Sequence, residues 1–292
     1  MKMKKGLRNN YRSNMPLFER ISKDFRSWSQ DRKHRKFHKG ELPVIVTWPD
    51  FPSKRTTIHK IADHLHFRLT NKAMSSADIL LFFHDQTKKE WQIDGWMKHP
   101  KRVNEHCKDI SKEAVELVHQ NLLGYGTFID PLNFNGTAVM KSDDNAKHDG
   151  KYIECPISST EEGYIYQKVL SNKTEDGQAV DIRVPVIGFK PVLAYHKFKS
   201  WDQRFTNEVT HSTLLDLSDI FSEAEVEQIG LFTEEMGAEF CELDVIRDQG
   251  DGKIYIIDVN TTPYGPPAGL NEKDRNKAVE LLSAAFQRSF VD

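Results

Sequence analysis

The sequence lacks long apolar runs: no stretch reaches the roughly 18 consecutive apolar residues that would indicate a membrane span. Its N-terminus is basic, but no apolar segment follows, which argues against a secretory signal peptide. Cysteine is scarce, and Cys107, Cys155 and Cys241 are too widely spaced for a disulfide framework or a zinc site. We therefore expect a reduced, cytoplasmic protein.

Glycine is missing from residues 41–94, although this region contains a small folding unit. Leu42–Trp48 and Asp78–Phe83 are expected to be buried strands, and Pro52–Leu65 carries apolar residues at helical spacing. This pattern predicts a small Rossmann-like α/β unit. Without glycine it has no dinucleotide-binding fingerprint, so a nucleotide is expected to bind elsewhere in the chain.

Charge is unevenly distributed, although the net charge is only −2. Residues 1–39 hold thirteen Lys or Arg and three Asp or Glu, whereas the remainder holds 28 and 40. Phe18, Ile21, Phe25 and Trp28 recur at helical spacing in this basic arm and predict an amphipathic helix. Such a helix can contact a membrane surface, or dock on the body of the protein or on a second subunit of a homodimer. Its aromatic residues form one stripe and no stacking platform, so no nucleic-acid partner is expected.

A predicted hairpin near the C-terminus carries the strongest chemical signal. The β-rich runs Cys241–Arg247 and Ile254–Asn260 flank a Gly-Asp-Gly turn. A register centred on this turn sets Asp244 opposite Asp258, and strand alternation places Asn260 on the same face.

The neighbours Ile246 and Ile256 are expected on that face too and indicate that it is buried. Two carboxylates and an amide oxygen would be costly to bury together without a cation. Oxygen ligands of this kind suit Mg²⁺, which often binds one or two carboxylates together with substrate phosphates. The alternative is an ordinary surface hairpin with acidic residues.

Other segments add weaker signals. A helix is expected over Lys112–Leu123, and a strand over Thr137–Lys141 ends in a lysine. The polar loop 142–150 that follows can wrap its backbone N–H groups around phosphates, or it is a plain hairpin turn. In the next strands, Asp181 and Arg183 are two residues apart and therefore share a face.

The order of these elements resembles an ATP-grasp protein from about Asn104 to the C-terminus. The motifs that carry the resemblance are Asp-Ile-Arg at 181–183, Arg-x-x-Asn at 204–207, and Asp244 with Asp258-x-Asn260. The pattern is most similar to the ribosomal-modification, glutamate-adding ligases. It implies an α+β fold in which two subdomains clasp ATP, preceded by the small Rossmann-like domain. The expected divisions are a basic arm (1–39), a pre-grasp domain (40–103), a central subdomain (104–170) and a C-terminal subdomain (171–292).

The resemblance also implies roles for individual residues. The implied ATP-binding residues are Lys112 and Lys141 for phosphates, Gln167, Lys168, Val169 and Leu170 for adenine, and Asp181 for ribose. The implied catalytic residues, near the transferred phosphoryl group, are Arg183, Arg204 and Asn207. The implied ligands of Mg²⁺, with Mn²⁺ as an alternative, are Asp244, Asp258 and Asn260.

Two departures from the family pattern stand out. Asp258 occupies a position where the family usually has Glu, and the shorter side chain changes how the carboxylate can bridge metals. The phosphate loop contains Asp143, Asp144 and Asp149 in place of a glycine-rich run. Because these carboxylates would repel ATP, we expect them to point outward or to meet a cationic substrate.

The resemblance implies a carboxylate–amine ligase that uses ATP and Mg²⁺ and forms an amide through an acyl phosphate. Its partners would be small-molecule or peptide carboxylates and amines. An ATP-grasp kinase that phosphorylates a hydroxyl would use the same residues, so the sequence leaves this alternative open. A non-catalytic nucleotide-binding scaffold is a second alternative, which the intact set of metal ligands disfavours.

Overall fold

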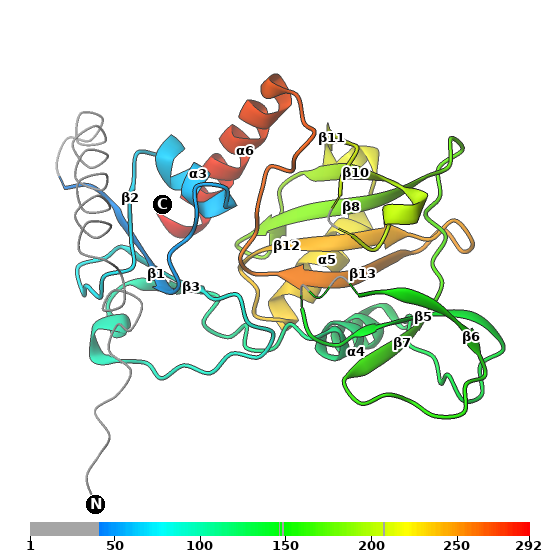
Figure 1. Cartoon of the computed structure of the whole chain (residues 1–292). Coiled ribbons are helices and arrows are strands. Elements are labelled where there is room, and N and C mark those ends of the chain that lie inside the picture. Colours follow the sequence, from blue (N-terminus) through cyan, green and yellow to red (C-terminus); the bar gives the residue numbers. More distant parts are fainter. Residues whose placement is uncertain (1–40, 146, 148, 207) are drawn as a thin grey trace, which may run out of the picture.

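The computed structural model describes residues 41–145, 147, 149–206 and 208–292. The predicted basic arm and its amphipathic helix, and Asn207, lie outside the described residues. Within them the chain forms three β-sheets with four α-helices (Figure 1). None of the helices in the described ranges is long and apolar enough to cross a membrane.

The first sheet is parallel and has the strand order β2-β1-β3-β4. Its strands are β1 (Val44–Pro49), β2 (Arg68–Thr70), β3 (Ile79–Phe83) and β4 (Lys101–Val103). The two strands expected from the sequence are therefore confirmed as β1 and β3. The expected helix is α3 (Thr57–His64), which begins later than predicted because residues 50–56 form a turn-rich loop.

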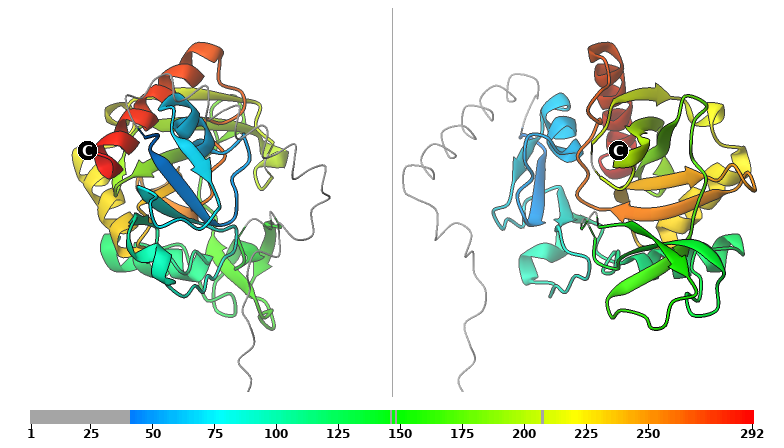
Figure 2. Two further views of the ribbon diagram at one scale, coloured as in Figure 1. Left: turned by 90° about the vertical axis from the view of Figure 1, so that its left-hand side faces the viewer. Right: turned by 45° about the vertical axis from the view of Figure 1, so that its right-hand side comes forward.

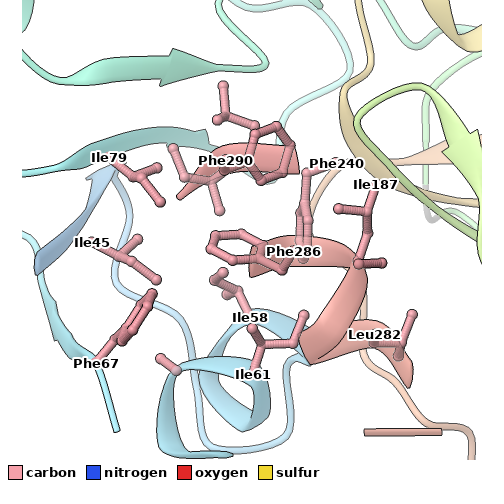
Figure 3. Packing of buried hydrophobic residues seen from close by; sticks show 14 of the residues in the cluster. Ile45, Ile58, Ile61, Phe67, Ile79, Ile187, Phe240, Leu282, Phe286 and Phe290 are labelled. Atoms are coloured by element: carbon pink, nitrogen blue, oxygen red, sulfur yellow. The ribbon is translucent and has the colours of Figure 1, made fainter. Parts of the chain in front are cut away.

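This sheet shares a hydrophobic core with elements from the end of the chain. Helix α6 (Glu272–Phe290) lies beside α3 between the first sheet and the largest one (Figure 1 and Figure 2). Phe286 and Phe240 meet Ile58 and Ile45 in one cluster, as Figure 3 shows. The N-terminal sheet is thus held against the rest of the protein by apolar burial.

The second sheet is small and antiparallel, with the order β6-β5-β7. Its strands are β5 (Gly136–Ser142), β6 (Lys151–Cys155) and β7 (Tyr164–Lys168). Helix α4 (Lys112–Leu123) has the predicted bounds, because Ser111 caps its first turn and Gly124 ends it with a left-handed φ of 77°.

The third sheet has the path β11-β10-β8-β12-β13, with β9 (Lys190–Pro191) paired to β8. Its main strands are β8 (Gln178–Ile187), β10 (Ala194–Ser200), β11 (His211–Leu215), β12 (Phe240–Arg247) and β13 (Ile254–Asn260). Helix α5 (Glu223–Glu235), opened by a capping box of Ser222 and Glu225, packs Ile229 and Phe232 on one face of this sheet. The short 3-10 turns are η1 (Gly95–Lys98), η2 (Trp201–Gln203) and η3 (Leu217–Asp219).

The predicted hairpin is β12–β13, and Asp244 does lie opposite Asp258. One detail of the prediction is wrong: a β-bulge follows this pair, so that Ile256 is opposite Val245. Both residues belong to the core beneath α5. Ile257 takes the expected place of Ile256 and packs with Ile246 on the other face.

Candidate active site

One face of the large sheet is covered by α5, and the opposite face carries a row of polar side chains. Tyr195 of β10, Arg183 of β8, Asp244 of β12 and Asp258 of β13 are cross-strand neighbours in register. Between them in sequence lie apolar residues such as Val184, which point into the α5 core because side chains alternate along a strand. The alternation therefore gathers ionisable groups from four strands on one face.

Arg183 and Asp244 form the central ion pair of this row. Nε of Arg183 lies 2.9 Å from Oδ1 of Asp244, and Nη2 lies 3.0 Å from Oδ2. Although burial favours the protonated acid, the charges of Arg183 and Lys197 hold the pKa of Asp244 well below its ordinary value. Asp244 is therefore ionised, and its carboxylate is paired with the guanidinium of Arg183.

Glu242 lies behind this pair and is 1% exposed. Its Oε2 is 3.4 Å from Nη1 of Arg183, and its Oε1 accepts a hydrogen bond from Thr57 of α3 at 3.2 Å. Burial raises the pKa of Glu242, and Arg183 opposes that rise. This carboxylate joins the polar face to helix α3 of the N-terminal unit.

Asp258 is different, because no hydrogen bond or ion pair from the described residues reaches its carboxylate. Burial raises the pKa of Asp258, and the charges of Lys112 and Lys141 oppose the rise. Asn260 lies two residues further on, and its Oδ1 accepts from the backbone N–H of Thr262 at 2.8 Å.

The donor set around Asp258 consists of oxygen atoms. Among the described residues no group of three or more His, Cys, Asp and Glu side chains could hold a metal. The face offers one open carboxylate (Asp258), one carboxylate bound by arginine (Asp244) and one amide oxygen (Asn260). This set fits Mg²⁺, because Mg²⁺ commonly takes one or two carboxylates and completes its shell with phosphates and water.

Lysines extend the row beyond the residues expected from the sequence. Nζ of Lys199 lies 2.7 Å from Oδ2 of Asp181, and Nζ of Lys197 lies 3.8 Å from Oδ1 of Asp244. Asp181 also accepts from Asn172 at 3.1 Å. Burial lowers the pKa of Lys197, because desolvation disfavours the ammonium form. Asp181, which the resemblance assigns to ribose, is thus held in place by a lysine and an amide.

Lys141 and Lys112 bring positive charge from the second sheet and from α4. Burial and the neighbouring charge of Lys112 lower the pKa of Lys141 to about 8, whereas Asp258 opposes the shift. Nζ of Lys112 donates to the backbone oxygen of Asp144 in the predicted phosphate loop, at 2.9 Å. The structure therefore brings both lysines within electrostatic reach of Asp258.

The predicted adenine segment runs from β7 into the linker that follows. The Gln167 side chain donates to Oγ1 of Thr127 at 2.6 Å, and Nζ of Lys168 donates to the Tyr255 hydroxyl at 2.6 Å. Leu170 is buried in the small cluster that includes Ile246 and Tyr255, and Val169 is exposed. The segment thus lies beside the part of the polar face where Ile246 and Ile257 replace the charged residues.

Arg204 follows η2 and reaches from the large sheet to the small one. Its guanidinium donates to the hydroxyl of Tyr152 on β6 and to the backbone oxygen of Leu170. The rings of Trp201 and Phe205 lie 4.5 and 5.2 Å from it. Arg204 is therefore held by aromatic rings and by contacts with Tyr152 and Leu170, whereas Arg183 lies within the central row.

Sequence reasoning misses three buried charges of this face: Lys197, Lys199 and Glu242. A signal for the lysines exists in Ala194–Ser200, where they alternate with apolar or aromatic residues inside a strand. Glu242 shares the parity of Asp244 along β12, so the same alternation indicates its face.

No protein-family model matches the sequence, and no curated protein matches it. The fold does resemble solved structures. The ATP-grasp ligase PsnB in complex with a minimal precursor matches with a TM-score of 0.56 and 12% identity, over 84% of this chain and 100% of that one. The D-alanine–D-alanine ligase of Bacillus anthracis in complex with ATP matches with a TM-score of 0.51 and 13% identity, over 86% and 95%. The chain has the ATP-grasp fold.

Proposed function

We propose that this protein is an ATP-dependent carboxylate–amine ligase. The two solved structures described above are named as ligases, and one of them was determined with ATP. In the proposed reaction a substrate carboxylate attacks the γ-phosphate of ATP to give an acyl phosphate and ADP. An amine then displaces phosphate and forms an amide.

The observation that carries this proposal is the row of half-buried charges on the large sheet. Arg183, Asp244 and Asp258 lie on adjacent strands, and the charges of Asp258 and Asp244 act on the pKa of Lys141. Keeping so many ionisable groups together away from water is costly unless a charged ligand shares the space. A nucleotide triphosphate with a divalent cation supplies charges of both signs.

The position of each residue suggests its role in the proposed reaction. Lys141 and Lys112 are suited to bind phosphates, and Gln167 to Leu170 are suited to cover adenine. Bound Mg²⁺, held by Asp258 with Asn260 and Asp244, would neutralise phosphate charge during transfer. Arg183 fixes the orientation of Asp244 through two parallel hydrogen bonds.

Arg204 remains our candidate for binding the reacting carboxylate, because a planar guanidinium can follow a carboxylate as it becomes an acyl phosphate. We extend the proposal to peptide as well as small-molecule carboxylates, because a solved PsnB structure contains a precursor peptide. The three cysteines are free and buried, which agrees with a reducing compartment, and we place the reaction in the cytoplasm.

The test is an ATP turnover assay with panels of free amino acids, N-acetyl amino acids and short acidic peptides. ADP and phosphate are measured, and hydroxylamine is added to trap the acyl phosphate as a hydroxamate. We expect ADP release that depends on a carboxylate, and a hydroxamate of matching mass. The Asp258→Asn variant is the matched inactive control. A stable phosphate ester without hydroxamate would identify a kinase and contradict the ligase assignment.

A further inference from the structure

The N-terminal parallel sheet has a topological switch point between β1 and β3. From β1 the chain proceeds to β2 on one side of the sheet, and β3 then lies on the other side. Open α/β sheets bind ligands outside the carboxyl ends of the strands at such a point. Asp50 directly follows β1, and His84 directly follows β3, so both lie at this position.

These two side chains are in contact. Nδ1 of His84 lies 2.8 Å from Oδ2 of Asp50, and the backbone N–H of Asp50 donates to the carbonyl oxygen of Phe83 at 3.2 Å. An ionised carboxylate can only accept, so the neutral imidazole carries its proton on Nδ1 and keeps a lone pair on Nε2. The His84 ring makes no other hydrogen bond within the described part of the chain, and its side chain is 22% exposed. Nε2 is therefore left without a partner among the described residues.

The same edge of the sheet adjoins the candidate active site. Asp85, next to His84, accepts from Oγ1 of Thr262 at 3.4 Å, and the backbone N–H of Thr262 donates to Asn260. Two residues further on, Thr87 accepts from the backbone N–H of Asn145 in the predicted phosphate loop at 2.8 Å. The segment after β3 thus bridges the end of β13 and the phosphate loop.

Lys89 continues this bridge. It is 3% exposed, and its Nζ donates to Oγ1 of Thr261 at 2.6 Å. The segment is consequently tied to the two residues that directly follow β13, Thr261 and Thr262. This anchoring fixes where the Asp50–His84 pair stands relative to the row of charges.

We propose that the edge of the first sheet at Asp50 and His84 is the subsite of the amine acceptor, in which His84 is the general base and Asp50 the positioning residue. The inference rests on the proposed ligase function. An amine arrives at neutral pH as an ammonium ion and must lose a proton before it can attack. One proton passes from the ammonium nitrogen to Nε2 of His84, and the nitrogen lone pair then forms the C–N bond to the acyl carbon. The C–O bond to phosphate breaks with its electron pair on phosphate, and the second N–H proton leaves to phosphate or water.

Hydroxylamine separates this step from the rest of the reaction. It is largely unprotonated at neutral pH, so it attacks an acyl phosphate without a base. We expect His84→Gln to form hydroxamate at nearly the wild-type rate, and to form amide from ammonium chloride or amino acids about 100-fold more slowly or worse. Asp50→Asn should show the same selective loss to a smaller extent. His99→Gln, at an exposed position, is the matched control.

A second measurement detects the hydrogen bond between Asp50 and His84 directly, without any reaction taking place. In ¹⁵N-labelled protein, the His84 imidazole, assigned by its absence in His84→Gln, should be the Nδ1–H tautomer in the wild type and should lose this preference in Asp50→Asn. A wild-type Nε2–H tautomer would overturn the proposal, as would amide formation by His84→Gln at the wild-type rate. Wild-type protein that forms no ADP with any carboxylate would instead contradict the ligase function itself.

Discussion

Arg183 donates two hydrogen bonds to Asp244, from Nε to Oδ1 at 2.9 Å and from Nη2 to Oδ2 at 3.0 Å. Across the next strand pair Asp258 has no such partner among the described residues. Asp244 and Asp258 lie at equivalent positions on the two strands of the hairpin, but they are therefore electrostatically different. Asp244 is paired inside the protein, and Asp258 is available to a ligand.

This difference predicts opposite effects on stability. Asp244→Asn leaves Arg183 with only the more distant Glu242, so we expect a loss of about 3 kcal/mol in the free energy of unfolding. Asp258→Asn removes a half-buried carboxylate that has no partner among the described residues, so the metal-free protein should become slightly more stable. Both variants should lose Mg²⁺-dependent turnover. Urea unfolding with a chelator present measures the first effect, with exposed Asp94→Asn as the control. Equal stability of the two variants would contradict the ion pair between Arg183 and Asp244 as the difference between the two carboxylates.

A metal and a nucleotide should stabilise the wild type and reveal the role of Asp258. A ligand that binds only the folded state raises the unfolding temperature by mass action. We expect a non-hydrolysable ATP analogue with Mg²⁺ to raise the melting temperature of the wild type. The rise should be much smaller for Asp258→Asn and should disappear when a chelator is added. A full response from Asp258→Asn would remove this residue from the set of metal ligands.

Arg204 lies among the rings of Tyr152, Trp201 and Phe205, so its effect on the reaction needs to be separated from its effect on structure. We expect Arg204→Ala to lower kcat about 100-fold, the scale for losing one group that stabilises transition-state charge. Tyr152→Phe removes only the hydroxyl that accepts from Arg204, and should lower kcat less than about tenfold. Similar losses in both variants would mean that Arg204 acts by joining the small and the large antiparallel sheets. Steady-state kinetics on the two purified proteins decide between these roles.

His119 makes the stability of the protein sensitive to acid. It is fully buried against Tyr125 and Tyr255, neither ring nitrogen has a hydrogen-bond partner among the residues that the structure describes, and burial lowers its pKa from 6.5 to about 4. The unfolded state therefore binds more protons than the folded state between these values, and stability falls as the pH drops from 6.5 towards 4. The loss attributable to His119 should reach about 2 kcal/mol by pH 5.

The His119→Phe variant keeps an aromatic ring in place and cannot be protonated. Its melting temperature should fall less between pH 7 and pH 5 than that of the wild type. Exposed His99→Gln controls for the loss of any histidine and should behave like the wild type. An unchanged acid sensitivity in His119→Phe would assign the effect to other groups.

Periodicity and capping were sufficient to predict much of this fold from the sequence. The bounds of α4 follow from the Ser111 cap and Gly124, and the pairing of Asp244 with Asp258 follows from the turn between their strands. The short strands β2, β4 and β6 escape such reasoning, because three to five partly exposed residues carry too little pattern. The β-bulge after Asp244 also leaves no mark in the sequence, since any residue can occupy the extra position.

The site was harder to predict than the fold, because its contacts join distant parts of the chain. Glu242 meets Thr57, which lies 185 residues away, and Asp50 meets His84 across two strands. The alternation of charges along one strand is visible in the sequence, as for Lys197 and Lys199. Which of these charges pair with one another depends on strand order, and no local pattern encodes it.

Gly265 offers a last test, at the junction of the N-terminal sheet and the large sheet. A Cβ atom at this position would lie 2.3 Å from Oε1 of Glu242 and 2.7 Å from Oγ1 of Thr57. The Glu242 carboxylate is buried and held by Thr57 and Arg183, so it has little room to move. The Gly265 carbonyl also accepts from Nζ of Lys60 at 2.6 Å.

Gly265→Ala should therefore lower the free energy of unfolding by about 1–3 kcal/mol, the usual cost of overpacking a well-filled interior. Gly95→Ala is the matched control, because a Cβ there meets nothing within 4 Å and its φ lies outside the left-handed region. Since the junction also positions the segment with Asp50 and His84, amide formation should fall in Gly265→Ala more than in Gly95→Ala. Urea unfolding could instead find the two variants equally stable. The loop around Gly265 would then move to make room for the Cβ atom, and the contact between Thr57 and Glu242 would not hold the two sheets in place.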